Sequence, residues 1–214
     1  MKGDTLGASL CNSFRHHAAR PCLGVRAPDS GEFEWHTYGA VQLRASCVGA
    51  VLRQQLGAGG MLGIYGHNSL GWLVADLAAL FGGLVSVPLH TAMSAEGFVH
   101  CARHSGVRCI VCGAAEFEFV AAAVEQLPEV QAVVTFEPLP SEHPAAAAGG
   151  WAAAGGRWTE VASLAAVAER GGVLPPAARE PQPREDGEAL TIIYTSGSTG
   201  WPKGVPAWGG TAQR

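Results

Sequence analysis

Short apolar runs alternate with longer amphipathic segments through the middle of the chain. The runs lie at 61–65, 84–87, 107–112 and 130–135, so they begin about every 23 residues. Between them, apolar residues recur at helical spacing after Asn68 or Ser69, from Ser94 to about His104, and over 116–127. Strands that alternate with helices in this way predict an α/β fold: a doubly wound, mostly parallel sheet with helices on both faces.

The segments around this core also have interpretable patterns. Residues 1–60 predict a helix near 4–19, a hairpin from "CLGVR" and "EFEWHTY", and a helix over 39–56. Residues 61–135 form the βαβ core, and 136–157 are a low-complexity Ala/Gly/Pro insertion, which we interpret as a flexible excursion. Residues 158–205 predict a helix near 159–170, a Pro-rich linker, a last strand "ALTIIY" and a loop, and 206–214 form a tail.

The loop after that last strand carries the strongest chemical signal, "YTSGSTGWPKGV". Its glycines let backbone N–H groups approach an anion, its hydroxyls can donate hydrogen bonds, and its lysine supplies a point charge suited to phosphate. In an α/β sheet, ligands bind at the carboxyl ends of strands. The residues predicted to bind phosphate are Thr195, Ser196, Gly197, Ser198, Thr199, Gly200 and Lys203.

Other phosphate-binding loops do not fit these residues. A P-loop needs four residues between its glycines and then Gly-Lys-Ser/Thr, whereas Gly197 and Gly200 are separated by two residues and Lys203 precedes Gly204. A dinucleotide-binding turn would be followed by a helix, and no helical pattern follows here. A Ser/Gly surface loop is the simplest alternative, but the preceding strand and the Pro-Lys-Gly sequence favour a binding function.

"YTSGSTGWPKGV" closely resembles the phosphate loop of the AMP-forming acyl-adenylating superfamily. "GIYGHNSLGWLVADLAALFGGLVSVPLH" resembles the upstream segment of long-chain acyl-CoA synthetases, with Asn68, Trp72, Ala75 and "VPL" at 87–89 in the same order. The similarity covers most of residues 4–205. It implies a fatty acid–CoA ligase that uses ATP with Mg²⁺, forms acyl-AMP and pyrophosphate, and transfers the acyl group to coenzyme A. It also implies that the loop holds the β- and γ-phosphates, with Thr195 and Ser196 as hydroxyl contacts and Lys203 as the catalytic residue.

The resemblance further implies that this chain corresponds to the N-terminal portion of such an enzyme, an incomplete adenylate-forming domain. The family's adenine-binding strand, magnesium-associated glutamate, ribose-binding aspartate and C-terminal lysine would follow residue 214, so we expect the chain to be inactive alone. Two alternatives stay open: a non-catalytic nucleotide-binding remnant, or part of the adenylation domain of a carboxylic acid reductase. A dinucleotide-binding protein is disfavoured because "GIYGHNSLG" has the wrong glycine spacing.

Composition narrows the remaining functions. The formal net charge of −4 provides no basic footprint for nucleic acid. The apolar segment 70–89 contains Asp76, Gly82-Gly83 and Pro88, which disfavour a membrane-spanning helix. The first residues lack the apolar segment of a signal peptide, so we expect a cytoplasmic protein with reduced cysteines, with peripheral association with the endoplasmic reticulum or another internal membrane as an extension.

Three further patterns favour structural roles. Cys109-x-x-Cys112 lies in "VRCIVC", which has the composition of a buried strand, so the two side chains should point to opposite faces rather than to one metal. His100 and His104 have the i, i+4 spacing of a zinc-binding pair but lack the accompanying glutamate, and we expect surface or half-buried histidines. Pro206 predicts that no ladder strand continues from Val205.

Overall fold

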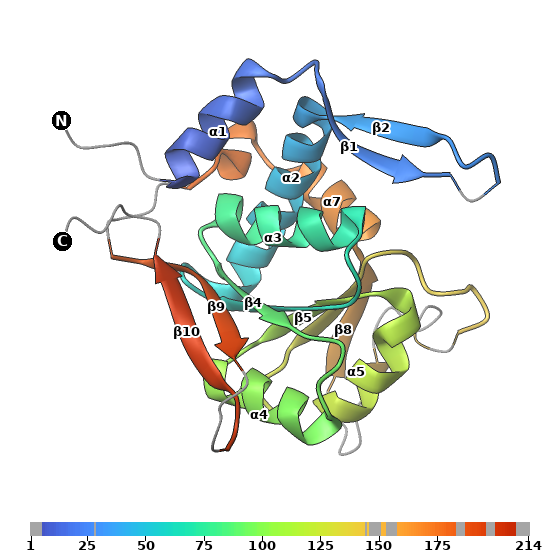
Figure 1. The fold of residues 1–214 in the computed structure, drawn as a ribbon, viewed down its shortest axis with the longest axis vertical. Coiled ribbons are helices and arrows are strands. Elements are labelled where there is room, and N and C mark those ends of the chain that lie inside the picture. Colours follow the sequence, from blue (N-terminus) through green and yellow to red (C-terminus); the bar gives the residue numbers. More distant parts are fainter. Residues whose placement is uncertain are drawn as a thin grey trace.

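A computed structural model describes residues 6–27, 29–143, 145, 151–152, 158–182, 187–195 and 200–208. Within these residues, eight strands form one sheet in the order β10-β9-β4-β3-β5-β6-β8-β7 (Figure 1). The strands are β3 (Met61–Tyr65), β4 (Val85–Leu89), β5 (Cys109–Cys112), β6 (Ala132–Thr135), β7 (Trp151–Ala152), β8 (Trp158–Ser163), β9 (Ala189–Thr195) and β10 (Lys203–Trp208). Neighbours pair in parallel except at the two edges, where β10 and β7 are antiparallel. The predicted doubly wound, mostly parallel sheet is confirmed.

Helices cover both faces of this sheet (Figure 1). One face carries α1 (Leu6–His16), α2 (Tyr38–Leu56), α3 (Leu70–Gly82) and α7 (Leu164–Gly172), and the other carries α4 (Ala95–Ser105) and α5 (Phe117–Val124). Two short 3₁₀ helices span Ala114–Glu116 and Pro176–Arg179. The predicted hairpin is also confirmed: β1 (Pro21–Arg26) and β2 (Phe33–Thr37) pair antiparallel outside the main sheet.

Side-chain caps explain where several helices begin. The hydroxyl of Ser69 accepts a hydrogen bond from the Trp72 N–H at 3.1 Å, and that of Ser94 accepts one from the Gly97 N–H at 3.1 Å. An N-cap of this kind satisfies a backbone donor that the first helical turn leaves unpaired. Ser94 was the predicted cap of α4, and Ser69 is the one of the two predicted candidates that caps α3.

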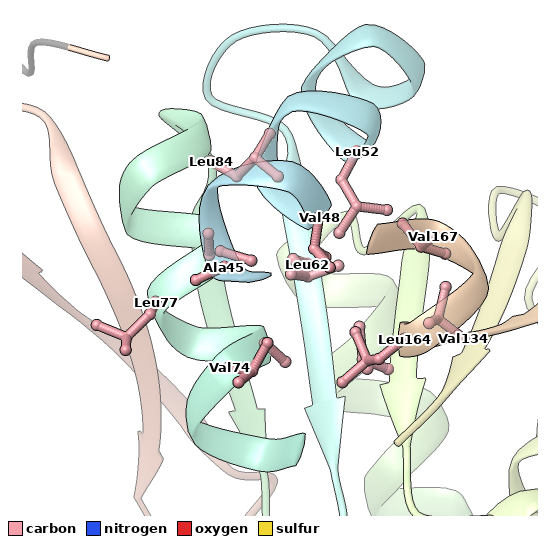
Figure 2. Close-up of a cluster of buried hydrophobic side chains, with 14 of the residues drawn as sticks. Ala45, Val48, Leu52, Leu62, Val74, Leu77, Leu84, Val134, Leu164 and Val167 are labelled. Carbon is pink, nitrogen blue, oxygen red and sulfur yellow. The ribbon is translucent and has the colours of Figure 1, made fainter. Parts of the chain in front are cut away.

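Two apolar cores, one on each face of the sheet, hold the helices against the strands. Above the sheet, α2 packs between α3 and α7, and Val48, Leu52, Leu62, Val74, Leu164 and Val167 are at most 1% exposed (Figure 2). Below it, Phe98 of α4 and Val120 of α5 pack against residues of β5 such as Ile110, all fully buried. Because alternate residues of each strand enter opposite cores, the central strands read as continuous apolar runs.

Two sequence predictions need correction. The helix expected near 159–170 is confirmed only from Leu164, where α7 begins. Residues 160–163 belong to β8 and pair in parallel with β6, and the Ser163 hydroxyl caps α7. Pro206 does not end the ladder, because it pairs with Ile192 within β10. A proline is tolerated there because β10 lies at the sheet edge and has a neighbour on one side only. The insertion at 136–157 lies partly outside the described residues, and its described part includes β7.

Asp76 is a half-buried ionisable group that lines a pocket beside the upper core. It projects from α3 beside Trp72 and toward Ser86 of β4, which is 2% exposed, and the Ser86 hydroxyl is hydrogen-bonded to the carboxyl group. Burial raises the pKa of the Asp76 carboxyl above its usual value, and the Ser86 hydrogen bond opposes the rise without cancelling it. Among the helices of the described residues, none combines the length and apolar character that crossing a membrane requires.

Replacing Asp76 by asparagine should therefore stabilise the protein at neutral pH. The folded state holds the proton more tightly than the unfolded state, so the stability linked to this group is fully present below about pH 4, near the unfolded pKa, and is lost as the pH rises through the folded pKa. Urea unfolding of both proteins between pH 4 and 8 checks this. The advantage of Asp76→Asn should grow with pH, and an advantage that shrinks with rising pH would contradict the assignment.

Candidate functional site

The predicted phosphate loop joins the last two strands of the sheet. β9 runs parallel to β4, with Ser86 and Thr191 in register, and then turns back as β10. The loop therefore leaves β9 at the carboxyl ends of the parallel strands, which is the edge where α/β sheets bind ligands. This placement agrees with the prediction made from the sequence.

The described residues include three of the seven predicted phosphate-binding positions: Thr195, Gly200 and Lys203. Thr195 ends β9, Lys203 begins β10, and the two are register partners. The Thr195 hydroxyl donates to the Lys203 carbonyl oxygen at 3.5 Å. Ser196, Gly197, Ser198 and Thr199 lie outside the described residues.

Thr195 and Lys203 present compatible groups at the base of the loop. Directly opposed residues of an antiparallel pair project from the same face of the sheet, and both of these residues are exposed. Among the ion pairs of the described residues, none involves Lys203, so its ammonium group is not neutralised by a carboxylate there. A cation and a hydroxyl on one face, beside a Ser/Gly loop, suit an anion with several oxygens.

A cleft lies beside the point where the loop enters β10. It has a volume of about 390 Å³ and is lined by Met93, Ser94 and Gly97 from the start of α4, and by Gly200, Trp201 and Pro202. The loop exit thus faces the beginning of α4. Ser94 serves as a helix cap here, as the sequence predicted, because its hydroxyl is used by the Gly97 N–H.

Four side chains connect α4 to the two ends of the loop. The imidazole of His100 stacks on the indole of Trp201, with ring centroids 4.9 Å apart and planes at 24°. His104 Nδ1 lies 2.7 Å from the hydroxyl oxygen of Tyr194. The expectation of a half-buried and a surface histidine is confirmed, since His100 is half-buried and His104 is exposed. Their contacts with the loop ends were not predicted, because the partners lie 90 or more residues away in the sequence.

Burial sets the protonation of two groups next to this contact. It raises the pKa of the Tyr194 hydroxyl, which therefore keeps its proton at neutral pH and can donate it. It also raises the pKa of the neighbouring Cys101 thiol to about 11, so this cysteine is not a thiolate nucleophile at neutral pH.

The described residues offer little for a protein-bound metal. No group of three or more His, Cys, Asp or Glu side chains in this part of the chain could hold an ion. Cys109 and Cys112 lie on β5, and both are buried, which confirms the strand predicted for "VRCIVC". The groups around the loop are a cation and hydroxyls. These groups suit a phosphate ligand better than they suit a bare divalent cation, which prefers carboxylate and carbonyl oxygens.

Comparison with protein families identifies one match. The family described as "AMP-binding enzyme" matches residues 14–207. The chain is 29% identical over 210 residues to long chain acyl-CoA synthetase 6, peroxisomal, of Arabidopsis thaliana. The aligned region covers 92% of this chain and 28% of that protein. It is 28% identical over 180 residues to fatty acyl-CoA synthetase A of Dictyostelium discoideum, covering 82% of this chain and 25% of that protein.

A solved structure shows the same architecture. The adenylation domain of a carboxylate reductase from Mycobacterium chelonae superimposes with a TM-score of 0.83 at 29% identity, covering 97% of this chain and 35% of that chain. The match includes nearly all of the chain. In both comparisons the chain spans about a third or less of its relatives' length.

Proposed function

The chain belongs to the AMP-binding enzyme family, and from that premise we propose that the β9–β10 hairpin and its loop bind the β- and γ-phosphates of ATP in a carboxylate-activating reaction. The observation that carries the proposal is the pairing of Thr195 with Lys203, which places a hydroxyl and an un-neutralised cation on one exposed face at the loop base. Family membership confirms the resemblance found in the sequence. The roles of the individual residues are part of the proposal.

In the proposed reaction, a carboxylate oxygen attacks the α-phosphorus of ATP and forms the acyl–phosphate bond. The bond from the α-phosphorus to the bridging oxygen breaks, and pyrophosphate leaves with that oxygen. Negative charge builds up on the leaving pyrophosphate. The Lys203 ammonium would stabilise this charge, and the Thr195 hydroxyl would do so by exchanging its long, 3.5 Å bond to the Lys203 carbonyl oxygen for one to a phosphate oxygen. Both would keep the phosphates in line for departure, a contribution from positioning and electrostatics.

The proposed nucleotide is ATP with Mg²⁺. When bound, the ion would neutralise part of the charge on the phosphate oxygens. The described residues contain no carboxylate cluster beside the loop that would hold the ion. We propose that Lys203 and Thr195 contact the phosphate oxygens rather than the ion.

The proposed acid is a fatty acid, and the proposed acceptor is the thiol of coenzyme A. The support is that two relatives are named as acyl-CoA synthetases, one of them for long chains. The second candidate is the adenylation step of a carboxylic acid reductase, which the similarity to the Mycobacterium chelonae domain favours. Either reaction belongs to the complete protein, of which this chain would form the N-terminal portion. The third candidate is a nucleotide-binding remnant without catalysis.

Carboxylate-dependent exchange of pyrophosphate into ATP tests the proposal. We expect exchange with fatty acids in the complete protein, formation of an acyl thioester when coenzyme A is added, and no exchange by the 214-residue chain alone. A requirement for a carrier-protein thiol in place of coenzyme A would favour the reductase. Nucleotide binding with no exchange by any form would favour the remnant, and the absence of both would contradict the proposal.

For its location we propose the cytoplasm, with peripheral attachment to the endoplasmic reticulum or another internal membrane. A relative named as peroxisomal makes the peroxisome the main competing location. Imaging of the tagged protein beside markers for both compartments separates them.

A further inference from the structure

Both ends of the predicted phosphate loop are attached to one side of α4. His100 and His104 are four residues apart on this helix, so their side chains lie on the same face. His104 contacts Tyr194, the residue before Thr195, and His100 contacts Trp201, the residue after Gly200. The six residues 195–200 are therefore bracketed by two contacts to a single rigid element.

The contact at the loop entrance is a directional hydrogen-bond chain. The Tyr194 hydroxyl donates to the carbonyl oxygen of Cys101 at 3.1 Å, so its single proton is used. His104 Nδ1 lies 2.7 Å from the same hydroxyl oxygen, and the histidine tautomer with hydrogen on Nδ1 can donate to it. In this orientation the Tyr194 hydroxyl donates one hydrogen bond and accepts another, so it links His104 to the Cys101 carbonyl oxygen.

The contact at the loop exit is a stack of three rings. Trp201 lies on His100 at a centroid distance of 4.9 Å, and His100 lies on His104 at 5.7 Å with planes at 22°. Trp201 is 57% exposed, so burial in a core does not explain its placement. Aromatic pairs with this geometry attract each other beyond the area they bury.

We propose that His100 and His104 are positioning residues that hold the entrance and exit of the loop at the spacing needed to bind a polyphosphate. The inference rests on the proposed function for its ligand. Contacts that hold Tyr194 and Trp201 in place before the ligand arrives reduce the conformational entropy that binding must remove from these two positions. If the binding-competent fraction of the loop falls, the apparent affinity falls by the same factor.

Calorimetric titration of the 214-residue chain with MgATP and with inorganic tripolyphosphate tests the exit anchor. His100→Ala and Trp201→Ala should each weaken binding by about 3- to 10-fold, with little change in the melting temperature. His100→Phe keeps a ring for the stack and should restore wild-type affinity. Trp208→Ala is the matched control, because Trp208 is 55% exposed on the same hairpin and has no ring contact within the described residues.

A parallel pair of variants tests the entrance anchor. The side-chain amide of asparagine can place an N–H near the position of His104 Nδ1, so His104→Asn should keep most of the affinity while His104→Ala loses several-fold. A purely structural role for the ring would predict that the two variants behave alike.

The outcomes separate this inference from the proposed function. If the wild-type chain binds, Lys203→Ala abolishes binding, and His100→Ala binds like wild type, the positioning role is wrong and the phosphate loop stands. If the wild-type chain binds neither probe, the proposed function fails for this chain. Amide hydrogen exchange at Trp201 then decides the inference: faster exchange in His100→Ala but not in His100→Phe supports the anchor, and unchanged exchange overturns it.

Discussion

Lys203→Ala is expected to lower the rate of ATP-dependent carboxylate activation by about 10- to 150-fold. A hydrogen bond to a charged group contributes about 1.5–3 kcal/mol, and each 1.36 kcal/mol is a factor of ten in rate. The loss should appear in kcat/KM for ATP, measured by pyrophosphate exchange in the complete protein. The folded hairpin should survive, because Lys203 is exposed and its backbone makes the ladder contacts with β9.

The sequence offers a matched control, since Lys2 is the other of its two lysines. Lys2→Ala removes the same charge at a distant sequence position and should leave exchange unchanged. Lys203→Arg should recover only part of the activity, because a planar guanidinium presents its donors differently from a compact ammonium. Exchange at the wild-type rate in Lys203→Ala would remove this residue from the reaction.

Gly171→Ala is expected to destabilise the fold by about 2–3 kcal/mol. Gly171, near the end of α7, is buried where this helix crosses α2, and an added Cβ would fall inside contact distance of the Cys47 carbonyl. The obstacle is backbone, which cannot move away as the end of a side chain can. Overpacking of this kind costs about 1–3 kcal/mol, occasionally more. In a chain of this size the melting temperature should fall by roughly 4–12 °C.

The adjacent residue is the control. Gly172 occupies the same helix, and a Cβ there would have nothing within 4 Å. Gly172→Ala should therefore be neutral or stabilise by up to about 1 kcal/mol, since alanine is the better helix former. Equal melting temperatures for the two variants would show that α2 and α7 are not packed as closely as described.

The central α/β alternation could be predicted from local pattern because each element carries its own signals. The runs at β3 and β4 are apolar on both faces, and serine caps precede α3 and α4. The location of the loop also followed from the sequence, since a Ser/Gly segment after a strand of an α/β sheet has one favoured position. Family membership agrees with the prediction made from the loop and its upstream segment.

The errors arise where tertiary context overrides local preference. The helix predicted near 159–170 begins only at Leu164, because residues 160–163 pair with β6, a partner some 28 residues away. Pro206 was expected to end the ladder of strand hydrogen bonds. A proline is excluded only from an interior strand, and β10 is an edge strand. Whether a strand lies at the edge or in the interior of the sheet depends on the order of all the strands. A short stretch of sequence does not contain that information.

The anchors of the loop were missed for a related reason. His100 and His104 were considered as a pair on a helix, and their spacing says nothing about Trp201, about 100 residues later in the sequence. Only the packing of α4 beneath the β9–β10 hairpin brings these rings together.

The most direct test of the phosphate-loop assignment is binding of MgATP, tripolyphosphate and AMP to the isotopically labelled chain, followed by NMR. The proposed contacts are to the β- and γ-phosphates, so ATP and tripolyphosphate should bind with similar affinity and AMP at least about tenfold more weakly, since one charged hydrogen bond already contributes that much. The largest amide shifts should fall within residues 195–204. Equal affinity for AMP, or shifts centred elsewhere in the chain, would contradict the assignment.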